Sequence, residues 1–312
     1  MGVVVSIVGP TASDKTELAV ALAQHLHTEI VNADARQVYR GMAIGTAQPS
    51  AEELAGAKHH FVDFLSPSEL FSAGAFEAQA VPVLTELCAE RGSAVLAGGS
   101  GMYVEAALRG LDPLPADLAI RTALNGRLKE EGLAPLMDEL RHLDPIHAQR
   151  MDTSNPQRVV RALEVCLASG KPFSSFHHGE PKPRPWRVVS IGLNPERSEL
   201  RERIAKRAQI MMEAGWLEEA RALLPHRHEN ALNTVGYKEL FEHLDGTCSL
   251  DEAVEWIVTR TRQFAKRQMT WFKKDASTTW FDYTADTRDA QMKRALAFGV
   301  EQVEALNHSG FL

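Results

Sequence analysis

The chain has 312 residues, of which 44% are hydrophobic, enough to bury a substantial core in about two domains or in one large domain with an insertion. No stretch approaches the roughly 20 apolar residues of a membrane helix, and the apolar start lacks a basic leader, so neither a membrane protein nor a signal peptide is indicated. Three scattered cysteines without a CxxC pair indicate neither a disulfide framework nor a zinc site, and they favour a cytoplasmic protein with reduced thiols.

The formal net charge of -7 argues weakly against a nucleic-acid ligand, but the charge is unevenly distributed. Residues 1–110 carry 6 Lys and Arg against 12 Asp and Glu, which accounts for -6 of the total. In contrast, the segment Arg260–Lys274 holds six basic residues and no acidic one. A local basic face can bind phosphates on an anionic protein, although the same run also fits a solvated helix face.

Strand and helix signals alternate over the first 110 or so residues. They are strand Val3–Val8, helix 15–27, strand Glu29–Asn32, helix 75–91 with Pro82 inside it, and strand Ser93–Ala97. The first strand is a continuous β-branched run, as a buried parallel strand requires. The alternation predicts an α/β fold with a doubly wound parallel sheet.

Strand signals vanish between about residues 112 and 180, where the pattern predicts helices over 116–131, 133–142 and 156–169. A strand returns at Arg187–Leu193, and the segment 196–275 is mostly helical. We therefore expect an α/β core at 1–112, a helical insertion at 113–183, and a remainder at 184–312 that completes the core and adds C-terminal helices.

A phosphate-binding loop follows the first strand. Its residues are Gly9, Pro10, Thr11, Ala12, Ser13, Asp14, Lys15 and Thr16. Backbone amides at a helix start cradle anionic oxygens, Lys15 supplies charge, and the Thr16 hydroxyl can reach Mg²⁺. Asp14 stands where the P-loop pattern has its second glycine, so we expect a carboxylate that faces the anion site and weakens the binding of an anionic ligand.

Asp34 follows the second strand and is therefore expected beside the phosphate loop, because ligands of parallel sheets sit at the carboxyl ends of the strands. A carboxylate there could hold a metal or act as a general base, and it could also simply cap a turn.

Six segments occur in one order: GPTASDKT, NADARQVYRGMAIGTAQPS, AGGSGMYVEAAL, NPQRVVRALEV, LNTVGYKEL and RQFAKRQMTWF. Together they resemble the bacterial tRNA dimethylallyltransferase (tRNA isopentenyltransferase) family over about residues 3–281. The resemblance implies a P-loop kinase-like fold whose loop holds the diphosphate of dimethylallyl diphosphate. The implied reaction moves the dimethylallyl group to N6 of the adenosine at position 37, next to the anticodon of tRNA.

The resemblance implies a role for several residues. Asp34 becomes the general base and Gln37 a substrate contact, in a motif that reads Asp34, Ala35, Arg36 and Gln37, with Ala35 in place of the family serine. Lys15, Thr16 and Arg203 become the groups that hold the diphosphate and Mg²⁺. Gln48 stands where the family usually has lysine.

Further residues match segments that contact tRNA in the family. They are Ser100, then Gln157, Arg158, Val159, Val160 and Arg161, then Val235, Gly236, Tyr237 and Lys238, and finally Lys266, Arg267 and Gln268. The implied partners are the tRNA anticodon stem-loop, dimethylallyl diphosphate and Mg²⁺, with the protein a cytoplasmic monomer.

Three other functions remain compatible with the sequence. A small-molecule P-loop kinase would bind ATP in the same loop, but it would leave about 200 residues unexplained. An adenylate isopentenyltransferase would perform the same chemistry on a free nucleotide. An inactive RNA-binding relative is suggested by Asp14, Ala35 and Gln48.

Overall fold

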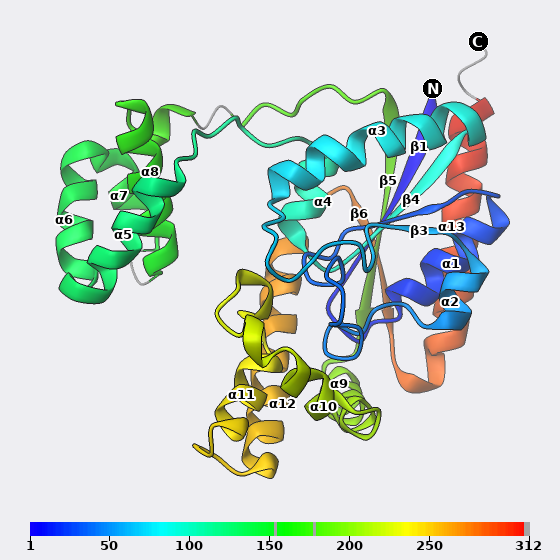
Figure 1. Ribbon diagram of the computed structural model, residues 1–312. Coiled ribbons are helices and arrows are strands. Elements are labelled where there is room, and N and C mark those ends of the chain that lie inside the picture. Colours follow the sequence, from blue (N-terminus) through cyan, green and yellow to red (C-terminus); the bar gives the residue numbers. More distant parts are fainter. Residues whose placement is uncertain (153–154, 177–178, 309–312) are drawn as a thin grey trace. The chain divides into compact units, whose positions relative to one another are not determined.

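The computed structural model describes residues 1–152, 155–176 and 179–308, which form two compact units (Figure 1). The first unit combines Met1–Arg109 with Pro183–Leu312, and the second is Gly110–Lys182, against the range 113–183 expected from the sequence. No helix among the described residues is long and apolar enough to span a membrane.

The first unit is built on a parallel sheet with the strand order β3-β2-β4-β1-β5-β6 among the described residues. The strands are β1 (Gly2–Val8), β2 (Ile30–Asn32), β3 (His59–His60), β4 (Ser93–Ala97), β5 (Trp186–Pro195) and β6 (Thr278–Tyr283). The strands β2, β3 and β4 lie on one side of β1, and β5 and β6 lie on the other. This reversal beside β1 is the place where open α/β sheets bind ligands. The predicted doubly wound α/β class is confirmed.

Helices cover both faces of the sheet, which explains why β1 is apolar throughout (Figure 1). Successive side chains of a strand point to opposite faces. Val5 and Ile7 accordingly join the core beneath α1 (Lys15–His25) and α13 (Arg288–His308). Val4 joins the core beneath α3 (Ala73–Arg91). Each such fully buried side chain contributes about 1.5–3 kcal/mol of hydrophobic stabilisation.

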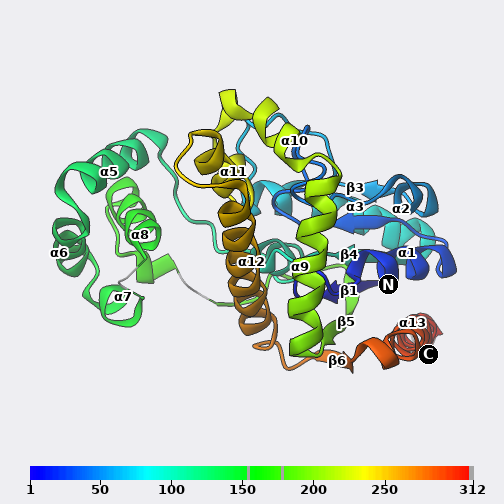
Figure 2. The same ribbon diagram turned by 90° about the horizontal axis from the view of Figure 1, so that it is seen from below.

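A group of helices extends the first unit beyond the carboxyl ends of the strands. Its members are α9 (Arg197–Glu213), α10 (Trp216–Ala222), α11 (Tyr237–Leu244) and α12 (Leu250–Phe272). Helix α12 begins at a reciprocal capping box between Ser249 and Glu252 and lies beside α9 (Figures 1 and 2). Two shorter helices, α2 (Ala51–Gly56) and α4 (Gly101–Leu108), and three 3₁₀ turns, Leu224–His226, Asn230–Leu232 and Ala285–Thr287, complete the described part of this unit.

The second unit is a small helical bundle. It consists of α5 (Leu118–Glu131), α6 (Leu133–Leu143), α7 (Pro145–Arg150), α8 (Pro156–Ser169) and a 3₁₀ turn at Phe173–Phe176. Its own hydrophobic core includes Leu136 and Leu163. A buried carboxylate, Glu164, accepts hydrogen bonds from the guanidinium of Arg121 and the backbone amide of Asp117, and it forms an ion pair with Arg161.

Several element boundaries differ from the sequence expectation. The helix expected from residue 116 begins at Leu118, because Asp117 caps it through hydrogen bonds to two backbone amides. The short helix α7 and the edge strand β6 were not expected, and β5 extends beyond the predicted Arg187–Leu193 at both ends.

Candidate active site

A cavity of about 930 Å³ lies at the carboxyl ends of the strands, within the first unit. The loops after β1, β2 and β4 line it, together with residues of α9 and α12. It therefore brings Lys15, Asp34 and Ser100 to one place, although these residues come from three separate loops. Parallel strands produce this convergence because their carboxyl ends share one edge.

The phosphate loop runs from the end of β1 to the start of α1. The Ser13 hydroxyl donates to the Pro10 carbonyl at 2.8 Å, and the Lys15 ammonium donates to the same oxygen at 2.5 Å. Ala12 and Asp14 have positive φ values of 61° and 60°, in the left-handed region. Asp adopts this conformation more readily than most residues, so Asp14 can keep the backbone path that a glycine would take.

The surroundings of the Lys15 ammonium disfavour its charged form. Burial, reinforced by the nearby Arg207 charge, lowers the pKa of Lys15 to about 8, and Asp34 and Asp14 partly oppose the shift. Burial and a neighbouring cation both disfavour a protonated lysine, whereas a bound anion favours it. This environment suits the binding of a phosphate or diphosphate.

Arg207 is a cavity residue that the sequence analysis missed. It projects from α9, where its guanidinium lies 3.5 Å from the Thr11 hydroxyl. Burial lowers the pKa of Arg207, while Asp34, Glu53 and Asp14 oppose that shift. The sequence did hold a signal, because Arg207 follows Arg203 by four residues and so lies on the same helix face.

One oxygen of the Asp34 carboxylate accepts hydrogen bonds from the backbone, and the other does not. Its Oδ1 accepts hydrogen bonds from the backbone amides of Arg36 at 2.9 Å and Gln37 at 3.3 Å. Within the described part of the chain, no hydrogen bond to Oδ2 is found. The amides fix the orientation of the carboxylate and leave Oδ2 as the oxygen that can accept a proton.

A folded loop supports the residues that follow Asp34. The Gln37 amide donates to the carbonyls of Thr46 and Ala47, and the Gln48 amide donates back to those of Gln37 and Tyr39. Gln48 thus closes this loop through its own hydrogen bonds. The carboxylate of Glu219 accepts from the Ile44 and Gly45 amides at 2.8 Å and from the Tyr237 hydroxyl at 2.6 Å. Tyr237 is fully buried, so its side chain supports the cavity wall.

Ser100 and Gln268 connect separate loops of the site. The Ser100 hydroxyl accepts a hydrogen bond from the Ala35 amide at 2.9 Å. The buried Gln268 amide accepts from the Thr11 backbone and donates to the Gly99 carbonyl, each at 2.8 Å. A Cβ at Gly99 would lie only 2.4 Å from the Gln268 nitrogen, which explains the glycine at this position.

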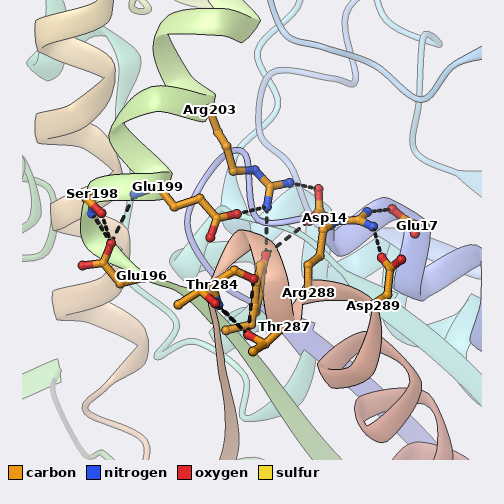
Figure 3. Close-up of polar contacts among 11 residues, drawn as sticks. Asp14, Glu17, Glu196, Ser198, Glu199, Arg203, Thr284, Thr287, Arg288 and Asp289 are labelled. Atoms are coloured by element: carbon orange, nitrogen blue, oxygen red, sulfur yellow. Dashed lines mark hydrogen bonds and ion pairs between the residues drawn. The ribbon is translucent and has the colours of Figure 1, made fainter.

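The Asp14 carboxylate lines the cavity, as expected from the sequence, but it is paired with cations that the sequence did not predict. It forms ion pairs with Arg203 and with Arg288, and it accepts a hydrogen bond from the Tyr283 hydroxyl at 3.3 Å (Figure 3). The two arginines come from α9 and from the start of α13, so no local sequence pattern reveals them. Arg203, expected to hold a diphosphate, is occupied by Asp14 and Glu199.

The remaining predicted tRNA contacts fall in different environments. Gln157, Arg158, Lys238, Lys266 and Arg267 are exposed, whereas Val159, Val160 and Gly236 are buried. Val235 is half-buried and lines the cavity. Arg161 is paired with Glu164 and donates to the carbonyls of Leu114 and Pro115.

Oxygen donors around Thr16 suit a divalent cation. Thr16 and Asp34 both line the cavity and offer oxygen atoms. No group of three or more His, Cys, Asp or Glu side chains able to hold a metal occurs among the described residues. Mg²⁺ is usually bound through few protein oxygens together with waters and substrate phosphates, so this donor set fits it.

Comparisons with known proteins agree with the resemblance noted from the sequence. A family model described as IPP transferase matches residues 37–275. The chain is 45% identical to the tRNA dimethylallyltransferase of Christiangramia forsetii over 286 residues, which cover 91% of this chain and 95% of that protein. It is 37% identical to the full-length tRNA isopentenylpyrophosphate transferase of Bacillus halodurans, with a TM-score of 0.71 over 99% of this chain and 100% of that one. A eukaryotic dimethylallyltransferase acting on tRNA shares the fold, with a TM-score of 0.81 at 23% identity over 98% of this chain and 80% of that one.

Proposed function

The chain belongs to the IPP transferase family, and we propose that it transfers a dimethylallyl group from dimethylallyl diphosphate to N6 of the adenosine at position 37 of tRNA. The observation that carries the proposal is the single cavity that combines a phosphate loop with a carboxylate from the next loop. Relatives named tRNA dimethylallyltransferase support the choice of donor and acceptor.

The donor diphosphate binds at the phosphate loop. The amides at the start of α1, the Lys15 ammonium and the Arg207 guanidinium are positive groups at the phosphate loop, and Arg203 and Lys206 of α9 also line the cavity. As the allylic C–O bond breaks, negative charge accumulates on the departing diphosphate, and these groups stabilise it in place without having to move. Leaving-group departure is the step that needs this help, because the adenine amine is a weak nucleophile.

Asp34 is the general base. When the C–N bond forms, N6 of adenine becomes positively charged and loses a proton, and Oδ2 of Asp34 accepts it. The two backbone amides on Oδ1 hold the carboxylate in one orientation during this transfer. The adenine must leave its stack to reach the cavity, which costs a few kcal/mol and least in a single-stranded loop.

Magnesium is the proposed cofactor, with the Thr16 hydroxyl as its protein ligand. When bound, it neutralises part of the charge of the diphosphate. Oxygen donors at Thr16 and Asp34 support this assignment.

The anticodon stem-loop of tRNA is the proposed macromolecular partner. In the helical unit, the side chains of Gln157 and Arg158 are exposed at the start of α8, where the Asn155 side chain caps the backbone amides and the arginine suits a phosphate. In the first unit, Lys238, Lys266 and Arg267 are exposed cations. We propose a monomer that acts in the cytoplasm.

A labelled-transfer assay tests the proposal. The enzyme is incubated with dimethylallyl diphosphate carrying a labelled prenyl group, Mg²⁺, and one of three acceptors: tRNA with adenosine at position 37, the same tRNA with guanosine there, or AMP. Label is expected only in the first tRNA. Label in AMP would identify an adenylate isopentenyltransferase, and ATP consumption without prenyl transfer would identify a kinase. Binding of tRNA without any transfer would identify an inactive relative.

A further inference from the structure

Asp14 occupies the last position before the Lys15-Thr16 pair, where a phosphate loop has glycine. It has left-handed backbone angles, φ 60° and ψ 24°, and its side chain makes no capping hydrogen bond at the start of α1. The carboxylate is therefore not used to satisfy the loop amides, which stay available to a ligand.

Instead, the carboxylate is surrounded by cations from distant segments (Figure 3). One oxygen bonds to the Arg203 guanidinium, and the other accepts from Arg288 Nε at 2.9 Å. Tyr283 also donates to it, and the Arg203 guanidinium lies over the Tyr283 ring at 5.9 Å. Only 15% of the Asp14 side chain is exposed, so solvent screens these contacts weakly.

Both arginines have further carboxylate partners. Glu199 lies 3.4 Å from Arg203, and Glu17 and Asp289 pair with Arg288. In addition, Arg203 lies within hydrogen-bonding distance of the Tyr283 hydroxyl, at 3.5 Å. The Arg203 guanidinium is thus held on several sides at once, and a diphosphate could recruit it only by breaking its bond to Asp14.

The Asp14 carboxylate has the charge and the bidentate oxygens of a small anionic ligand. Arginine binds carboxylates and phosphates through the same planar fork, so the two compete for one guanidinium. We propose that Asp14 is a positioning residue that occupies Arg203 as an internal anion, so that the donor diphosphate is bound by Lys15, Arg207 and the loop amides without a contact from Arg203. This inference rests on the proposed function.

The ion pair between Asp14 and Arg203 limits which cations can bind the donor diphosphate. With Arg203 occupied, Lys15 and Arg207 are the cavity cations seen in contact with the phosphate loop among the described residues: Lys15 donates to the Pro10 carbonyl, and Arg207 lies beside the Thr11 hydroxyl. Replacing Asp14 by glycine would leave the loop conformation accessible and release Arg203 to bind the diphosphate. Whether Arg203 contributes to donor binding therefore depends on the side chain at position 14.

A double-mutant cycle tests this dependence. The wild type, Asp14→Gly, Arg203→Gln and the double variant are compared by KM for dimethylallyl diphosphate, kcat at saturating tRNA, and calorimetric binding of inorganic pyrophosphate. We expect Arg203→Gln to change KM by less than about threefold in the wild type and to raise it about tenfold or more in the Asp14→Gly background, since only there is a charge-assisted bond lost. In both backgrounds kcat should stay within about threefold.

Two controls keep the outcome interpretable. Asp14→Asn also tolerates the left-handed conformation and removes the charge, so it replaces Asp14→Gly if the glycine variant unfolds. Arg294→Gln removes an exposed arginine of the same helix as Arg288 and should leave every measurement unchanged.

An equal effect of Arg203→Gln in both backgrounds would overturn the inference. A wild type that binds pyrophosphate but transfers nothing would refute the proposed function, and the cycle would then be decided by pyrophosphate binding alone.

Discussion

The side-chain amide of Gln268 accepts a hydrogen bond from the backbone amide of Thr11 at 2.8 Å, although the two residues are 257 positions apart in the sequence. The Gln268 Nε2 atom also donates a hydrogen bond to the Gly99 carbonyl oxygen at 2.8 Å. One residue of α12 therefore fixes the phosphate loop against the glycine turn that follows β4. The resemblance of its segment to tRNA-contacting residues did not reveal this internal position.

Replacement of Gln268 by methionine should weaken both the fold and donor binding. The substitution keeps the volume but leaves the half-buried Thr11 amide and the buried Gly99 carbonyl without partners, and the buried carbonyl accounts for about 1–3 kcal/mol. Urea denaturation should report a loss of about 1–3 kcal/mol, and the KM for dimethylallyl diphosphate should rise. Unchanged stability together with an unchanged KM would show that the loops are positioned without this link.

Donor binding should decline at alkaline pH because of Lys15. Its pKa in the free protein is lowered to about 8, and only the charged ammonium attracts the diphosphate. Below about pH 8 the ammonium is already present, whereas above it binding must include protonation. The logarithm of the association constant should then fall by up to about one per pH unit. Calorimetry from pH 6.5 to 9.5 measures this, and the slope should disappear in Lys15→Gln.

The sequence was sufficient to predict the convergence of Lys15 and Asp34, because each directly follows a parallel strand and such strands end at one edge of the sheet. It could not reveal the partners of Asp14, since Arg203 and Arg288 lie far along the chain and reach it only after folding. Arg207 could have been found, because it follows Arg203 by four residues and shares its face of α9. The strand β6 was missed because its alternating pattern at the edge of the sheet is short and partly polar.

Two neighbouring basic residues of α12 should both contribute to the salt dependence of tRNA binding. Arg267 lines the candidate active-site cavity, whereas Lys266 lines a second cavity of about 960 Å³ formed with α9 residues. If each neutralises a phosphate, Lys266→Ala and Arg267→Ala should each reduce the slope of log K against log salt concentration by about one. A slope that is the same as in the wild type would assign that residue to a solvated helix face.

The helical unit should depend on the buried carboxylate of Glu164. Only 1% of this side chain is exposed, and it is paired with Arg121 and Arg161. Burial alone would raise the pKa of Glu164, but the hydrogen bonds from these arginines outweigh it and hold the pKa below its usual value. Its contribution to stability is therefore present above the unfolded pKa, about 4.3, and lost as pH falls through the folded one.

Glu164→Gln should accordingly destabilise this unit by about 1–3 kcal/mol at neutral pH, because it removes charge-assisted hydrogen bonds to a buried carboxylate, whereas Arg121 and Arg161 are partly exposed and can be solvated. The more exposed pair between Arg127 and Glu139 supplies a matched control, and Glu139→Gln should cost no more than about 1 kcal/mol. Equal denaturation midpoints for Glu164→Gln and the wild type would rule out this role.

The most direct test of the account is single-turnover transfer by Asp34→Asn with labelled dimethylallyl diphosphate and tRNA. Asparagine keeps one oxygen to accept the amides of Arg36 and Gln37, so the loop should stay in place and only the proton acceptor is lost. We predict a rate at least about 100-fold below that of the wild type, with the dissociation constants for tRNA and for dimethylallyl diphosphate within about threefold. A transfer rate close to that of the wild type would contradict the assignment of Asp34 as the base and, with it, the proposed mechanism.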